Sequence, residues 1–196
     1  SFHLFIIHIM NDTLDTPQRP DPASVSNNSL ALRYGLIWAG ISAVLTLVGF
    51  LTNTDPSNPA SGIGVKFLYG VISLAVAIWA VSMAIKTDRD VQLGGFMSLG
   101  RSVGLGAKTG LVSGVVSGIF TVLYMTVINS GYTDAIKQAA MAEYERQGLN
   151  EEQIEMAMGM ASKFMSPTFL GVTAVIGGII TGLIIGLVAG AIMKRD

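Results

Sequence analysis

Four long apolar blocks separated by polar segments dominate the hydrophobic pattern of this chain. Each block runs without an Asp, Glu, Lys, Arg or His; the blocks are Tyr34–Thr52, Phe67–Ile85, Thr109–Ile128 and Thr168–Met193. A helix of about 20 apolar residues spans the hydrocarbon core of a bilayer. Inside lipid the backbone must satisfy its own hydrogen bonds, which favours helices over isolated strands. The pattern therefore predicts an all-α, polytopic membrane protein with four transmembrane helices.

The chain before the first block is polar. Residues 11–29 contain three of the six prolines and few large apolar residues, so we expect residues 1–29 to form a flexible tail before a membrane domain of residues 30–196. Residues 1–9 are apolar and precede Met10. We interpret them as an upstream extension or a cloning remnant rather than a signal peptide, because they lack a cationic start and a small-residue cleavage site.

The longest connection predicts an amphipathic helical hairpin over residues 132–166. Thr133 is expected to cap its first helix, and Gly148 suits the position just after that helix ends. Asn150 with Gln153 three residues later predicts a capping box for the second helix. One face of that helix is apolar, formed by Ile154, Met158, Ala161 and Met165. We expect the hairpin to rest on the outer membrane surface or on the bundle.

The connection over residues 87–107 mixes glycines with scattered large apolar residues. This composition favours a short interfacial helix under the bundle, and the alternative is a re-entrant loop.

Lys and Arg are unevenly distributed between the two sides that four crossings define. The side with both termini carries eight: Arg19, Arg33, Lys86, Arg89, Arg101, Lys108, Lys194 and Arg195. The other side carries four: Lys66, Lys137, Arg146 and Lys163. The positive-inside rule therefore predicts that both termini are cytoplasmic and that the hairpin is extracytoplasmic.

Glycines recur every four residues in the last two blocks. The two stripes are Gly106, Gly110, Gly114 and Gly118, and Gly178, Gly182, Gly186 and Gly190. Four-residue spacing places small residues on one helix face, where another backbone can approach closely. Either the third and fourth spans pack together within one subunit, or one stripe forms a homo-oligomer or partner interface.

Hydroxyl residues punctuate the spans, namely Ser73, Ser113, Ser117, Thr121 and Thr181. They either bond to carbonyls of their own helix or line a narrow polar path. Proton relays and most ion-coupled transporters use ionisable groups within the membrane, so their absence from the spans makes transport the weaker expectation.

Candidate chemistry is sparse. Cys is absent and the two histidines, His3 and His8, lie outside the membrane domain, so we expect no enzyme, no metal and no cofactor. Residues 102–109 lack both glycines that a phosphate-binding loop requires. The net charge of −1 gives no basic excess for nucleic acid.

The outer hairpin is rich in methionine: Met141, Met156, Met158, Met160 and Met165. Thioethers can bind copper(I), but methionine is also an adaptable packing residue at contact surfaces. We expect these methionines to contact a partner. Glu151, Glu152 and Glu155 more simply complement the start of their helix than bind calcium.

Several stretches between Ala31 and Lys194 resemble a bacterial family of uncharacterised membrane proteins. They include YGLIWAGISAVL, GGFMSLGRSVGLGAKTGLVSGVVSGIF, GLNEEQIEMAMGMASKFMSP and GLIIGLVAGAIMK. The family is domain of unknown function four-one-nine-nine. The resemblance implies four helices in a bacterial inner membrane and brings no activity, cofactor or catalytic residue.

The sequence favours a non-enzymatic inner-membrane protein that acts through helix packing and partner binding, as an accessory subunit, a scaffold or a homo-oligomer. The alternative is a small channel or transporter for a small solute, lined by hydroxyls and glycines of the last two spans.

Overall fold

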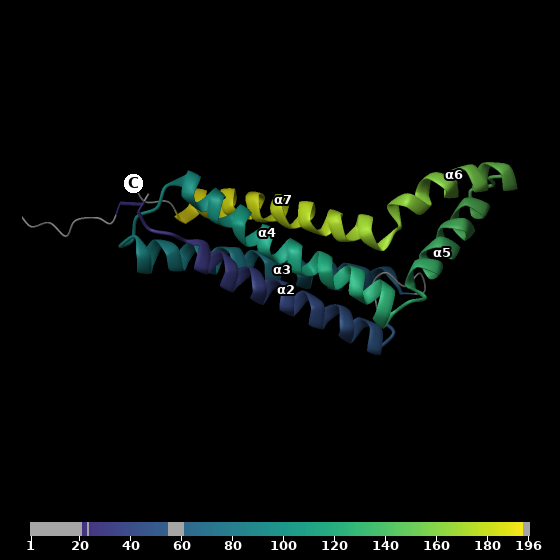
Figure 1. Cartoon of the computed structure of the whole chain (residues 1–196), viewed down its shortest axis with the longest axis horizontal. Coiled ribbons are helices and arrows are strands. Elements are labelled where there is room, and N and C mark those ends of the chain that lie inside the picture. The colour runs from purple at the N-terminus through teal and green to yellow at the C-terminus, as the bar shows by residue number, and fades with distance from the viewer. Residues whose placement is uncertain (1–20, 23, 55–60, 194–196) are drawn as a thin grey trace, which may run out of the picture.

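The computed structural model describes residues 21–22, 24–54 and 61–193, so residues 1–20 and 23 of the predicted tail over residues 1–29 lie outside them, and the last two residues of that tail already belong to the first helix. Four long helices lie side by side along the long axis: α2 (Asn28–Leu51), α3 (Ile63–Thr87), α4 (Leu99–Leu123) and α7 (Pro167–Met193) (Figure 1). Short π-helical turns extend two of them, at Asp88–Gln92 after α3 and at Tyr124–Ile128 after α4. The described residues contain no β-strand.

These four helices are long and apolar enough to cross a membrane. With their π-helical turns they run for 24, 30, 30 and 27 residues in chain order. At about 1.5 Å per residue, even the shortest reaches about 36 Å, which exceeds the hydrocarbon thickness of about 30 Å. Their outward faces carry exposed large apolar side chains, as lipid-facing surfaces do. The predicted all-α fold with four membrane helices is confirmed, and the protein is a multi-pass membrane protein.

The connection between α3 and α4 differs from the expected interfacial helix. Only residues 93–98 leave the helices, because Gly94 and Gly95 adopt left-handed φ values of 64° and 98° and reverse the chain. Ser98 then caps α4 by accepting a hydrogen bond from the Arg101 amide. The separate helix expected over residues 87–107 is therefore wrong, since most of that segment extends the two flanking helices.

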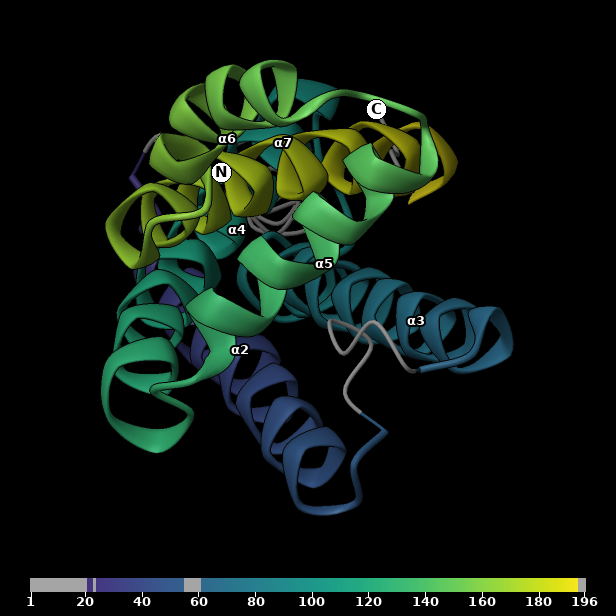
Figure 2. The ribbon, with the colours of Figure 1, turned by 90° about the vertical axis from the view of Figure 1, so that its right-hand side faces the viewer.

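The bundle has a tight end and an open end. We call the end that holds the start of α2 and the last residue of α7 the tail end, and the opposite one the hairpin end (Figure 1). The buried apolar core gathers toward the tail end, with Tyr34, Trp38, Val81, Ile85 and Leu105 among its members. At the hairpin end the near ends of α2 and α3 diverge from each other and from α7 (Figure 2).

The helices α5 (Tyr132–Arg146) and α6 (Glu151–Phe164) form a pair that projects beyond the hairpin end of the bundle (Figure 1). Asn150 and Gln153 form the predicted capping box, and Gly148 has the left-handed φ of 79° expected after α5. The predicted Thr133 cap is wrong, because the N-cap position of α5 is Gly131, two residues earlier, and it makes no side-chain cap. Ile154 is the one buried residue of the pair, so the hairpin is only lightly packed.

Candidate functional site

The two glycine stripes face each other along the contact between α4 and α7. A Cβ added at Gly178 would lie 2.5 Å from the carbonyl oxygen of Gly110, and one at Gly118 would lie 2.5 Å from that of Gly171. A Cβ added at any other member of either stripe would collide in the same way with backbone or side-chain atoms of the partner helix. Each stripe is therefore occupied within the same chain, which leaves neither stripe free to bind a second copy.

The other two long helices join this pair with unequal closeness. Gly35 of α2 approaches α4 tightly, since an added Cβ there would lie 2.8 Å from the Thr109 carbonyl oxygen. Gly64 and Gly70, toward the hairpin end of α3, have no neighbour within 4 Å of an added Cβ. Helix α3 therefore makes no close glycine contact at that end, and the four helices enclose open space there.

That space is a cavity of about 630 Å³, which we call the vestibule. Its lining comes from all four long helices and from the start of α5: Ser42, Leu45, Thr46, Lys66, Tyr69, Gly70, Ser73, Thr121, Tyr124, Met125, Tyr132, Leu170, Thr173 and Ala174. The volume falls within the range of about 300–1,000 Å³ that is typical of small-molecule sites. The vestibule thus offers a mostly apolar pocket with hydroxyl groups and one cation.

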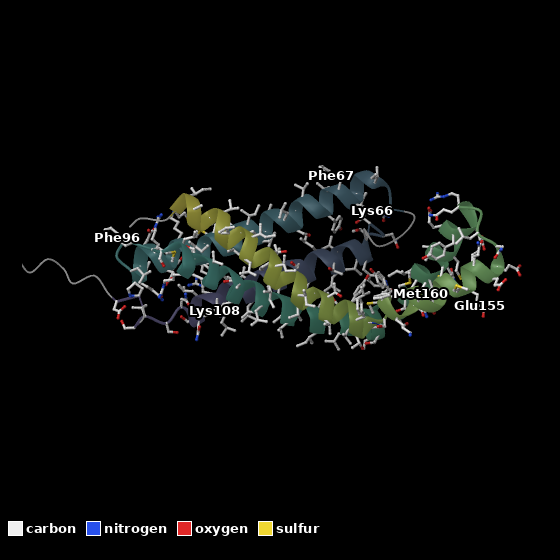
Figure 3. All side chains as sticks on the ribbon, turned by 90° about the horizontal axis from the view of Figure 1, so that it is seen from above. Lys66, Phe67, Phe96, Lys108, Glu155 and Met160 are labelled. Atoms are coloured by element: carbon white, nitrogen blue, oxygen red, sulfur yellow. The ribbon has the colours of Figure 1, made fainter. Side chains whose placement is uncertain are left out.

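The cation is Lys66, on the first turns of α3 near the hairpin end (Figure 3). Its side chain is exposed and forms no ion pair within the described part of the chain. Tyr69, one turn further along the helix, shares a hydrogen bond of 3.1 Å with Thr54 at the end of α2. This bond ties the diverging ends of α2 and α3 together beside Lys66.

The hydroxyls of the spans divide between bonds to their own helix and the wall of the vestibule. Thr121 lines the vestibule and also donates to the Ser117 carbonyl of its own helix at 2.8 Å. Of the other hydroxyl residues in question, only Ser73 lines the vestibule, and Ser113 is buried outside it in α4. The lining residues of the vestibule lie toward the hairpin end of the long helices, whereas the buried apolar core lies toward the tail end.

The methionines of the hairpin divide between two faces. Met158 and Met165 are half-buried, on the same face of the α6 segment as Ile154. Met156 and Met160 lie four residues apart on the opposite side and are 66% and 65% exposed. Phe164 continues that line at 59% exposure, and Met141 on α5 is also exposed. We call Met156, Met160 and Phe164 the outer stripe.

Aromatic contacts fix the hairpin at both of its roots. The Tyr132 ring packs against Tyr124 with centroids 5.6 Å apart, and Tyr124 also meets Phe50 of α2. At the other root, Phe164 packs edge-on against Phe169 of α7 at 5.0 Å. The hairpin is therefore held to the bundle at two points, and Met156 and Met160 of the outer stripe remain exposed beyond the second point.

A buried ion pair, which the sequence analysis did not predict, closes the tail end. Asp88 is fully buried and accepts two hydrogen bonds from the Arg101 guanidinium, at 2.7 and 2.9 Å. Arg101 also donates to the carbonyls of Pro22 and Val25. The pair thus fastens the chain before α2 onto the start of α4. The signal for this pair in the sequence was the presence of opposite charges, Asp88 and Arg101, on the two sides of the Gly94-Gly95 turn.

Metal and nucleotide chemistry find no support in this part of the chain. Residues 21–22, 24–54 and 61–193 contain no cluster of three or more His, Cys, Asp and Glu placed to hold a metal ion. Residues 102–109 are a regular stretch of α4, where the Ser102 hydroxyl is fully buried and donates to Met97 Sδ. The expectation of no enzyme, metal or cofactor stays a prediction.

Comparisons with known proteins give one result. No curated protein and no solved structure matches the chain significantly. The family model described as "protein of unknown function (DUF4199)" matches residues 33–195, which agrees with the resemblance seen between Ala31 and Lys194. Since this match covers nearly the whole membrane domain, the chain belongs to the DUF4199 family of proteins of unknown function.

Proposed function

We propose that this protein is a non-enzymatic bacterial inner-membrane protein that binds a partner through its α5–α6 hairpin, as an accessory subunit or scaffold. The outer stripe carries this proposal. Met156 and Met160 lie four residues apart on one helix face and are 66% and 65% exposed, and Phe164 continues that line at the root of the hairpin, where it contacts Phe169. Burying one such side chain contributes about 1.5–3 kcal/mol, so the exposed stripe favours association.

The charge of the hairpin indicates which surface fits it. Residues 132–166 carry six Asp and Glu against three Lys and Arg. The expected partner is therefore a membrane protein with an apolar patch rimmed by basic residues, and a second copy of this chain fits less well because its hairpin is acidic too. The positive-inside rule places this interaction on the extracytoplasmic side, with both termini in the cytoplasm.

Copurification from mild detergent tests this function. We expect the double variant Met156→Gln, Met160→Gln to lose a stoichiometric partner that the native chain retains, because the stripe becomes polar without a change in charge. The matched control is Ala142→Gln on α5, which introduces the same side chain at an exposed residue away from the stripe and also leaves the charge unchanged. Equal recovery of the partner with the native chain and the double variant would contradict the proposal.

The vestibule favours a second candidate function, a small channel or transporter for a small solute. It opens into the bundle from the hairpin end and ends at the packed core, as an outward-facing half of a path would. Gly70 borders it with free space around its Cβ position, so Gly70→Trp should fill it. Transport is supported if the native chain conducts a solute into liposomes, Gly70→Trp abolishes this flux and Gly177→Trp leaves it intact. Absence of flux for the native chain opposes transport.

A further inference from the structure

A second pocket, distinct from the vestibule, lies at the tail end between the chain before α2 and the outer face of α4. Its volume is about 450 Å³, and its lining is Pro22, Ser24, Val25, Ser26, Asn27, Asn28, Arg101, Gly104 and Lys108. None of these residues is acidic, while two are cationic and two carry hydroxyls. We call this the tail-end pocket.

The charge available in this pocket belongs to Lys108. Arg101 is already neutralised by Asp88, and its remaining donors hold backbone carbonyls, so it shapes the wall. Lys108 Nζ donates to the amide oxygens of Asn27 at 3.0 Å and Asn28 at 2.8 Å, both neutral groups. An ammonium with three donors and no carboxylate partner in the described chain retains its full charge for an anion.

The first turn of α2 adds backbone donors at the same place. Asn27 occupies the N-cap position, but its side chain accepts from Lys108 and makes no cap hydrogen bond to α2. The first-turn amides of a helix point toward its N-terminus and, with the helix dipole, favour an anion there. Ser26 supplies a hydroxyl beside them, which also accepts from the Asn28 amide at 3.4 Å, whereas the Ser24 hydroxyl donates to the Asp21 carbonyl at 2.8 Å. An ammonium, helix amides and hydroxyls are the groups that recognise phosphate.

The depth of the pocket indicates which phosphate it meets. The uncharged part of α4 begins at Thr109, so Lys108 marks the edge of the hydrocarbon. Arg101 lies seven residues, or about 10 Å, further out along the helix. The headgroup layer is about 5–8 Å thick on each side of the hydrocarbon. The pocket between these two side chains therefore lies at the level of lipid phosphates (Figure 3 shows Lys108 toward the tail end).

We propose that the tail-end pocket binds the phosphate of an anionic lipid headgroup, with Lys108 as the charged ligand and the first turn of α2 as the second donor group. The site is independent of the partner-binding function proposed above, because it lies at the opposite end of the bundle (Figure 1). Occupancy would add an acceptor for the first-turn amides of α2 and hold the chain before α2 against α4.

Native mass spectrometry of the purified chain in mild detergent, titrated with phosphatidylglycerol, tests the site. We expect Lys108→Gln to weaken binding on the order of ten-fold, the effect of one charge-assisted hydrogen bond. The matched control is Lys86→Gln, which removes the same charge from an exposed position of α3 on the same side of the membrane and outside the pocket. Equal losses in both variants would overturn the proposal, since they would show only a general effect of interfacial charge.

A second variant keeps the test valid if Lys108→Gln unfolds. An added Cβ at Gly104 meets nothing within 4 Å, so Gly104→Leu should fill the pocket while Lys108 remains. Loss of phosphatidylglycerol binding in this variant supports the site, and unchanged binding opposes it. Inorganic phosphate and phosphatidylcholine serve as further probes. Saturation by inorganic phosphate alone, or equal affinity for phosphatidylcholine, would overturn the assignment to an anionic lipid.

Discussion

One pair of substitutions on α7 tests the close packing of α4 and α7 with the same chemical change on two faces. Gly182→Ala adds a methyl group against α4, and Gly177→Ala adds the same group where nothing lies within 4 Å. Both changes replace glycine by alanine in the interior of one helix, so their difference isolates the contact.

The magnitude follows from the positions of the backbone atoms. A Cβ at Gly182 would overlap the carbonyl oxygen of Gly106 and lie 3.0 Å from its carbonyl carbon and 3.1 Å from Cα of Gly110. Carbon atoms pack best at about 3.5–4.0 Å, so the helices must part by about 0.5–1 Å and lose a quarter to a half of their dispersion attraction nearby. Overpacking of this kind costs about 1–3 kcal/mol. Both variants gain up to about 1 kcal/mol of helix propensity, and at Gly177 this gain meets no packing cost.

The free energy of unfolding, measured by SDS titration in mixed micelles with circular dichroism, separates the two variants. We expect Gly182→Ala to be about 1–3 kcal/mol less stable than Gly177→Ala, which is the packing cost alone, because the gain in helix propensity is common to both variants. Isoleucine at Gly114 or Gly182 should be worse still and prevent folding. Equal stability of the two alanine variants would refute close packing at the stripe.

Two further predictions concern the tail end and the hairpin. Arg101→Gln should destabilise the protein by about 3–5 kcal/mol, because it leaves the fully buried Asp88 without its partner. In the same SDS titration, the double variant Asp88→Asn, Arg101→Gln should lose less stability than the sum of the two single changes. Strict additivity would contradict the coupling between the two side chains. Asn150→Ala should remove the capping box and cost about 1 kcal/mol locally, so amide hydrogen exchange should rise in α6 and stay unchanged in α4.

The number and type of the main helices were predictable, because each depends on a local property. Hydropathy identified the four spans, and the Asn150–Gln153 pair identified the start of α6. The glycine stripes showed which faces allow close approach but left the partner open. In the structure each stripe packs against the neighbouring span of the same chain, so the partner depends on the chain's overall arrangement and not on the stripe itself.

The vestibule and the tail-end pocket were not predictable, because both depend on how helices diverge. The vestibule exists because α3 lacks a close glycine contact near Gly70, while α4 approaches α7 closely along both stripes and approaches α2 closely at Gly35. The tail-end pocket exists because Arg101 binds the carbonyls before α2 and holds that segment away from Gly104. The hydropathy pattern carries no information on how far apart the helices lie at the vestibule, or on how far the chain before α2 lies from α4.

The sidedness of single cysteines tests most directly the claim that the chain crosses the membrane four times with its hairpin outside. The sequence has no Cys, so each introduced thiol is the only one in this chain that a membrane-impermeant maleimide can label when it is added to intact cells. Gly62→Cys and Glu155→Cys should be labelled, whereas Asp21→Cys and Asp90→Cys should react only after the membrane is opened. Labelling of all four in intact cells, or of the opposite two, would contradict the account.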